Sequence, residues 1–501
     1  MSTDVRTGTV RTNVPGRLDR LPWSRWHWMI VIGLGTVWIL DGLEVTIVGN
    51  LSGKLAEQGS GLSITQSQVT GLAAALYVAG ACTGALFFGW LTDRFGRKKL
   101  FLLTLGLYLI ATALTALSFD TWWFFLFRFL TGMGIGGEYA AINSAIDELI
   151  PARHRGRIDI IINGTFWLGA GLGALLTVPL LNGLPTNLGW RVAFGLGAVL
   201  GVVILLVRRH VPESPRWWFI HGRADEANRL VDSVEAEVKR ETGKELTEAD
   251  DYIEIKQRKS TNFLEIARAL FARYPKRATL GFSLFIGQAF LYNAITFGFA
   301  QILQTFFKVP PGSSGYYFAV IALGNLLGPL LLGRLFDSVG RVPMIAGSYV
   351  GSGVLLLGTA WLFHAGVLNA VTMTACWCVV LFFASAGASA AYLTVSEIFP
   401  METRAMAIAF FYAIGTAAGG ITGPLLFAKL VGTGKVGDTV VAFVVGASVM
   451  IIGGLVELAL GVRAEGRSLE DLATPLSAER PGTPAPRAGT PTPTTDPATT
   501  G

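Results

Sequence analysis

The sequence is poor in charge, in histidine and in cysteine. Only 15% of its 501 residues are charged, whereas a soluble protein of this size carries about 25%. Its five histidines show no metal-ligand spacing, and all three cysteines lie in apolar segments. These shortages argue against a nucleic-acid-binding protein, a metal site and a disulfide framework.

Hydrophobic residues, by contrast, make up 51% of the chain and fall into separate segments. Each segment has roughly 20 residues, the length that a helix needs to cross a bilayer. The sequence therefore predicts an all-α integral membrane protein with twelve transmembrane helices. We expect the spans at residues 27–49, 68–90, 100–118, 122–147, 158–181, 190–208, 278–303, 316–334, 342–363, 369–394, 405–429 and 438–462.

Polar stretches divide the chain into five regions. We expect a cytoplasmic tail at 1–26, a six-helix bundle at 27–209, a cytoplasmic loop with short helices at 210–277, a second six-helix bundle at 278–465, and a disordered cytoplasmic tail at 466–501. Lysines and arginines gather in alternate connections, which places both termini of this multi-pass protein on the cytoplasmic side of the cell membrane.

The two predicted bundles repeat each other in sequence. The pattern G-x-L-x-D-x-x-G-R occurs at 89–97 and again at 333–341, and Glu-x-x-Pro occurs at 148–151 and 397–400. Both repeats fall at equivalent turns of their halves. Two six-helix pseudo-repeats around a site at the middle of the membrane are typical of transporters.

These motifs resemble those of the major facilitator superfamily. GWLTDRFGRKK at 89–99 is similar to its hallmark loop, and PESPR at 212–216 is similar to a sequence of its sugar-porter branch. The resemblance implies the major facilitator fold and secondary active transport of a small polar organic solute by alternating access. The solute would be a sugar, polyol or organic-acid metabolite carried in symport with H⁺.

Other activities have less support in the sequence. No nucleophile–base set or Walker loop is evident, so we expect neither an enzyme nor a bound cofactor. We also expect a monomer in the lipid bilayer, with no nucleic-acid partner. An uncoupled facilitator, an exporter on the same fold and a non-transporting solute sensor remain open alternatives.

Two carboxylates interrupt the first span. Asp41 and Glu44 lie at i and i+3, so they share one face of a helix. At 1.5 Å of rise per residue, Asp41 and Arg128 of the fourth span lie at matching depths and can pair. In proton-driven sugar porters the matching pair couples transport to protons, which the resemblance implies here. A static ion pair, a carboxylate of the solute bound at Arg128, and an outer-vestibule position for Glu44 remain open.

Charged residues of both signs gather at the predicted cytoplasmic ends of the helices. Positive-inside charge explains the arginines but not the matching acidic residues, so we expect a cytoplasmic gate that joins the two halves. Its predicted members are Asp93, Arg94, Arg97, Glu148, Arg157, Glu213, Arg216, Asp337, Arg341, Glu397 and Arg404.

Amide and aromatic side chains also occur within the predicted spans. They suit a small polar solute that is held by hydrogen bonds and ring faces, although polar contacts between packed helices would look the same. The predicted solute-binding residues are Asn163, Trp167, Gln288, Tyr292, Asn293, Trp377 and Tyr392. The run Gly132-Met-Gly134-Ile-Gly136-Gly137 satisfies G-x-G-x-x-G but lies inside a span, so it predicts helix packing and not a dinucleotide site.

Overall fold

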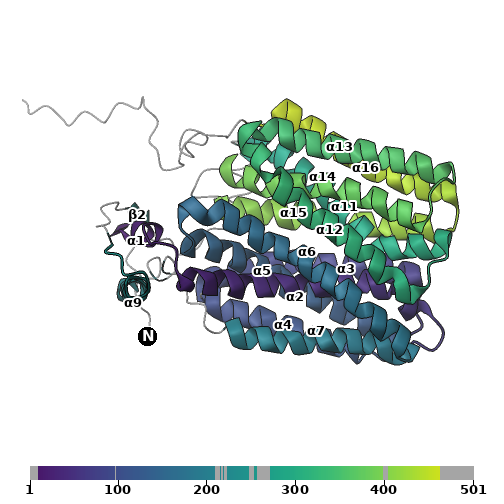
Figure 1. Ribbon diagram of the computed structural model, residues 1–501, viewed down its shortest axis with the longest axis horizontal. Coiled ribbons are helices and arrows are strands. Elements are labelled where there is room, and N and C mark those ends of the chain that lie inside the picture. Colours follow the sequence, from purple (N-terminus) through teal and green to yellow (C-terminus); the bar gives the residue numbers. More distant parts are fainter. Residues whose placement is uncertain are drawn as a thin grey trace, which may run out of the picture.

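A computed structural model describes residues 9–95, 97–208, 215, 218, 223–246, 253–256, 271–272, 274–398 and 404–462. Within these residues, twelve long helices run up and down through one bundle, six before helix α9 (Ala224–Thr242) and six after it (Figure 1). The first six are α2 (Arg25–Ala56), η1 with α3 (Gln68–Ala73 and Ala74–Phe95), α4 (Arg97–Ala116), α5 (Thr121–Leu149), α6 (Ala152–Gly183) and α7 (Thr186–Arg208). The second six are α11 (Pro275–Phe307), α12 (Ser314–Ser338), α13 (Arg341–His364), α14 (Ala370–Ile398), α15 (Arg404–Gly432) and α16 (Val436–Leu460).

These helices are built to lie in lipid. Among the described residues, ten helices are long and apolar enough to cross a membrane. A helix suits lipid because it satisfies its own backbone hydrogen bonds, for which the hydrocarbon offers no partner. Large apolar side chains such as Trp122, Leu331 and Trp361 remain exposed on the outside of the bundle. The prediction of an all-α membrane protein is confirmed.

The packing of the helices repeats between the two halves. In the first half α2 packs on α6, α3 on α5 and α4 on α7; in the second, α11 packs on α15, α12 on α14 and α13 on α16. The halves meet through the symmetric contacts α3–α15 and α6–α12, together with α2–α11. One pair of helix-interior prolines also corresponds, since Pro179 of α6 matches Pro424 of α15. The predicted pseudo-repeat is therefore confirmed.

The glycines of the fourth span pack against neighbouring helices. A Cβ atom at Gly132 would overlap the backbone oxygen of Tyr77, and one at Gly136 would overlap that of Ala81, both on α3. At Gly134 it would press on the Cβ of Tyr108 of α4. The predicted packing role of this glycine run is confirmed.

A small subdomain covers the end of the bundle at which α2 begins, which we term the α9 end. Strand β1 (Thr9–Thr12) pairs antiparallel with β2 (Ile253–Lys256), with Thr9 opposite Lys256. Helix α1 (Val14–Asp19) lies beside α9 (Figure 1). The segment that contains β1 and α1, which we term the strap, thus joins the start of the chain to the connection between the halves.

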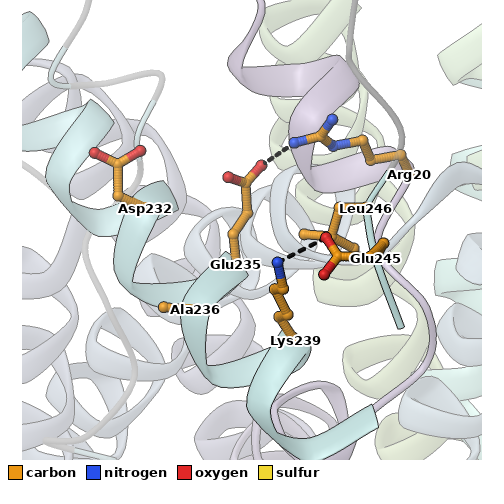
Figure 2. A pocket seen from close by; sticks show the side chains of 7 residues that line it. All are labelled: Arg20, Asp232, Glu235, Ala236, Lys239, Glu245 and Leu246. Atoms are coloured by element: carbon orange, nitrogen blue, oxygen red, sulfur yellow. Dashed lines mark hydrogen bonds and ion pairs between the residues drawn. The ribbon is translucent and has the colours of Figure 1, made fainter. Parts of the chain in front are cut away.

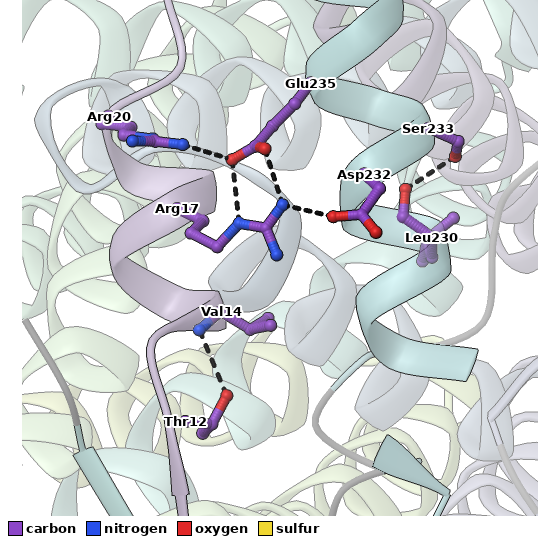
Figure 3. Close-up of polar contacts among 8 residues, drawn as sticks. All are labelled: Thr12, Val14, Arg17, Arg20, Leu230, Asp232, Ser233 and Glu235. Atoms are coloured by element: carbon purple, nitrogen blue, oxygen red, sulfur yellow. Dashed lines mark hydrogen bonds and ion pairs between the residues drawn. The ribbon is translucent and has the colours of Figure 1, made fainter. Parts of the chain in front are cut away.

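Ion pairs hold the strap on α9. Arg20 Nη2 lies 2.6 Å from Glu235 Oε1 (Figure 2). Arg17 contacts the other oxygen of Glu235 at 2.6 Å and Asp232 Oδ1 at 2.5 Å (Figure 3). The side chains of Arg17, Arg20 and Glu235 are only 15–19% exposed, so these contacts are partly shielded from water. Residues 1–26 were predicted to be a plain cytoplasmic tail, and this subdomain was not predicted.

Candidate functional site

A buried ion pair lies inside the first half. Arg128 Nη1 of α5 is 2.9 Å from Glu44 Oε1 of α2, and both side chains are 0% exposed. Removing two charges from water costs several kcal/mol per ion unless other groups compensate. This buried pair is therefore the candidate functional site.

The side chains around the pair come from three further helices. Thr112 of α4 donates a hydrogen bond of 3.3 Å to Glu44 Oε1. The Arg128 guanidinium carbon lies 5.0 Å from the centre of the Tyr77 ring of α3 and 5.6 Å from that of Phe194 of α7. Aromatic faces stabilise a cation in such a dry site. Nothing in the sequence spacing singled out Thr112, Tyr77 or Phe194.

Glu44, and not the predicted Asp41, forms the ion pair with Arg128. Asp41 is also fully buried on α2, one turn earlier, but the ion pair of Arg128 is with Glu44. The two carboxylates differ by about 4.5 Å in height on a helix, which is less than the error of a depth estimate from sequence. The expected Asp41–Arg128 contact is therefore corrected in this conformation, while the role of the three residues in proton coupling stays a prediction.

Tyr77 connects the buried pair to the second half. Its ring centre lies 5.0 Å from the Arg128 guanidinium carbon and 6.2 Å from the ring centre of Phe297 on α11. Arg128 is thus separated from the other half by one side chain.

The predicted solute-binding residues fall into two groups. The rings of Trp167 on α6 and Tyr292 on α11 lie 5.6 Å apart and so face each other across the halves. Gln288, one turn before Tyr292, is 5% exposed, and its Oε1 accepts no hydrogen bond from the residues that the structure describes. These three residues can form a polar site with aromatic walls.

Other predicted members of this site have local contacts. The Asn293 side chain donates a hydrogen bond of 2.8 Å to the backbone oxygen of Ala289 on its own helix. Trp377 is fully buried and packs edge-on against Phe443 of α16, within the core of the second half. Asn163 lies partly buried on α6. The side chain of Tyr392 lies outside the part of the chain that the structure describes.

The predicted gate lies almost wholly outside the described side chains. Of its members, Arg341 alone has a described side chain; it is the first residue of α13, at the α9 end, and is partly buried. The other members stay predictions: Asp93, Arg94, Arg97, Glu148, Arg157, Glu213, Arg216, Asp337, Glu397 and Arg404.

Comparisons with known proteins agree with this architecture. A family model described as "Sugar (and other) transporter" matches residues 26–475. The chain is 27% identical over 462 residues to the niacin transporter NiaP of Acinetobacter baylyi, covering 91% of this chain and 98% of that protein. It is 28% identical over 468 residues to the putative metabolite transport protein YdjK of Escherichia coli, covering 91% and 96%.

Among solved structures, the fold is similar to that of the xylose transporter XylE from E. coli in a partially occluded inward-open conformation. The TM-score is 0.68 at 17% identity, covering 89% of this chain and 100% of that one. This similarity concerns the fold alone. Together with the family match, it shows that the chain belongs to the sugar (and other) transporter family and is a sugar-porter-like member of the major facilitator superfamily.

Proposed function

We propose that this transporter carries a small polar organic solute by alternating access, driven by the symport of protons. The observation that carries the proposal is the fully buried pair of Glu44 and Arg128, with Asp41 one turn away. A buried guanidinium needs a negative partner. Protonation of the carboxylate therefore makes the buried position of the guanidinium unfavourable. The pair can therefore have two arrangements whose balance depends on a proton.

The contacts of Arg128 suggest how the proton is coupled to movement. When Glu44 is neutral, Arg128 keeps its aromatic contacts but loses its ion pair, and it gains by moving toward another acceptor such as Asp41. That movement changes the packing of Tyr77, which lies between Arg128 and Phe297 of α11. The proton thereby biases the contact between the halves. One proton moved across 100 mV supplies about 2.3 kcal/mol, or roughly a fifty-fold gradient of solute.

We propose that the solute binds against Trp167, Tyr292 and Gln288. Two aromatic rings favour a flat or ring-shaped solute, and the free amide oxygen of Gln288 favours one that donates a hydrogen bond. Sugars, polyols and organic-acid metabolites all fit this description. The relative named for niacin makes a pyridine carboxylate a further candidate.

We further propose that the α9 end faces the cytoplasm, because the basic connections of the sequence lie at that end. Both termini would then be cytoplasmic. The predicted charged residues at that end would close the cytoplasmic side in alternation with the opposite side. We expect the monomer to be the working unit.

Uptake into proteoliposomes tests the proposal. Purified protein is reconstituted with an imposed pH gradient and offered a panel that includes xylose, inositol and nicotinate, each with and without a protonophore. We expect one class of solute to accumulate only with the gradient. Glu44→Gln and Asp41→Asn should abolish accumulation but retain counterflow of that solute.

A matched control is Glu57→Gln, because Glu57 follows the end of the same helix and pairs with Lys54. It should leave accumulation unchanged. Uptake that the protonophore does not affect would instead identify a facilitator. Binding of a solute without counterflow would identify a sensor.

A further inference from the structure

Neutral side chains join the two halves at the end opposite α9. Gln301 of α11 is 3% exposed and lies between two residues of the first half. Thr70 Oγ1 donates a hydrogen bond of 2.5 Å to Gln301 Oε1, and Gln301 Nε2 donates one of 2.8 Å to Ser67 Oγ. The amide therefore uses both its acceptor and a donor to bridge the halves.

A second amide bridge lies beside the first. Gln66 Nε2 donates a hydrogen bond of 2.7 Å to Oε1 of Gln304. Gln304 lies one turn after Gln301 on α11. Gly53 of α2 makes room for this bridge, because a Cβ there would overlap the Gln304 amide. Ser314 Oγ adds a hydrogen bond of 3.1 Å to the backbone oxygen of Asn50. The halves are thus tied across α2, η1, α11 and the start of α12.

The first-half partners of Gln301 and Gln304 all belong to one short segment. Gln66 and Ser67 directly precede the π-helix η1, and Thr70 lies within it. Single π-helical turns are often found at functional sites, because they change the direction in which side chains point. At the far side, Gly432 at the end of α15 packs directly on Ser67. The segment is therefore enclosed by α11 and α15 of the second half.

We propose that Gln66, Ser67 and Thr70, together with Gln301 and Gln304, form a hydrogen-bonded latch that closes the outer side of the transporter. This inference rests on the proposed function, since only a transporter needs to open that side in each cycle. Breaking the latch exposes amides and hydroxyls, which water can satisfy. The latch thus contributes modest stability to the closed state and can open without separating charges.

The neutral latch also differs in its pH dependence from the buried ion pair. Hydrogen bonds between uncharged groups do not depend on pH near neutrality, whereas buried carboxylates do. Proton binding at the buried pair can then bias the cycle without altering the strength of the outer latch itself. Gln301 and Gln304 act as positioning residues that set the population of the closed state.

Distance measurement on purified protein tests the latch without any solute. Spin labels are placed on cysteines at the exposed positions Gln58 and Lys435, which lie on loops of different halves at this end. The native cysteines, Cys82, Cys376 and Cys378, are replaced by serine. We expect Gln301→Ala and Gln304→Ala each to raise the ratio of long to short distances about two- to tenfold, the range for one or two lost hydrogen bonds.

Gln68→Ala is the matched control. Gln68 lies in the same segment and is exposed, but its amide oxygen accepts from Thr65 N within its own half. It should leave the distances unchanged. Equal distance distributions in the parent, Gln301→Ala and Gln304→Ala would overturn the proposal.

A disulfide across the latch gives an independent test. An ideal Cβ at Gly432 lies 3.5 Å from the Cβ of Ser67, which is within the range that a disulfide spans. The variant Ser67→Cys/Gly432→Cys should cross-link on oxidation, stop uptake and recover it on reduction. Uptake at the parent rate by the oxidised protein would also overturn the latch. If no solute is transported by any variant, the proposed function fails while the distance measurement still decides the latch.

Discussion

At the scale of single residues, the first half contains a buried positive charge, that of Arg128, which depends on a single carboxylate for compensation. Within the described part of the chain, Arg128 has one ion-pair partner, Glu44, and two aromatic faces. The Nε and Nη2 atoms of Arg128 make no hydrogen bond to these described residues. The stability of the folded helices is therefore sensitive to that single carboxylate.

Glu44→Ala should destabilise the protein by about 3–5 kcal/mol, because it leaves a buried guanidinium without a partner. Thermal unfolding in detergent, followed by tryptophan fluorescence, measures the loss. Glu44→Ala/Arg128→Met should recover much of it. Thr112→Val removes a hydrogen bond to the pair and should cost only about 1 kcal/mol. An unchanged unfolding temperature in Glu44→Ala would contradict this account.

Two glycines offer a sharp contrast in packing. A Cβ at Gly136 of α5 would overlap the backbone of Ala81, whereas one at Gly106 of α4 would meet none of the described atoms within 4 Å. Gly136→Ala should therefore separate α5 from α3 and lower the yield of monodisperse protein. Gly106→Ala should be neutral or should stabilise the helix by up to about 1 kcal/mol. Size-exclusion profiles and unfolding temperatures of the two variants check the prediction.

At the scale of elements, the strap is a folded unit held by charge. Arg17 and Arg20 share Glu235, and β1 adds a short two-stranded ladder with β2. Burial raises the pKa of the Glu235 carboxyl, but the hydrogen bonds from Arg17 and Arg20 outweigh it and hold this pKa below its usual value. The contact is therefore strongest when Glu235 is ionised.

The strap should detach in acid. Because the pKa of Glu235 is lowered in the folded state, its contribution is complete above the unfolded pKa of about 4.3 and is lost as the pH falls below that value. Hydrogen exchange of residues 9–20 should therefore be slow at pH 7 and faster near pH 3.5. A rate that does not change after correction for intrinsic exchange would contradict the prediction.

Charge variants locate the same contact at neutral pH. Arg17→Glu should speed hydrogen exchange of the strap, because its side chain is only 15% exposed and contacts both Asp232 and Glu235. Arg25→Ala is the control. Its side chain is 92% exposed and lies 3.9 Å from Glu241, and such surface pairs contribute about 0–1 kcal/mol. Equal rates in the two variants would show that the ion pairs do not hold the strap.

At the scale of the whole molecule, the sequence was informative where a pattern is repeated or long. Twelve apolar segments and two copies of the G-x-L-x-D-x-x-G-R pattern sufficed for the helices and the pseudo-repeat. The pairing of Asp41, Glu44 and Arg128 was less accessible, because one helical turn decides which carboxylate meets the arginine. Helix propensity and hydropathy do not resolve that difference.

Other features left no local signal. The strap pairs residues near 10 with residues near 255, and neither strand is long or apolar enough to be recognised alone. Gln301 and Gln304 are single amides in a long apolar helix, where a packing role is equally common. Their partners, Gln66 for Gln304 and Ser67 and Thr70 for Gln301, lie at the start of a different helix. Only the three-dimensional arrangement brings these neutral side chains together.

The pairing of β1 with β2 also bears on the order of events during synthesis. Thr9 leaves the ribosome long before Lys256, its neighbour in the ladder. At 5–20 residues per second, the interval is about 12–50 s. During that time the six helices of the first half are synthesised, and β1 has no strand to pair with until β2 has been made. An affinity tag or a fluorescent protein fused ahead of Thr9 would therefore compete with this late pairing of β1 with β2, and a carboxy-terminal fusion would avoid that interference.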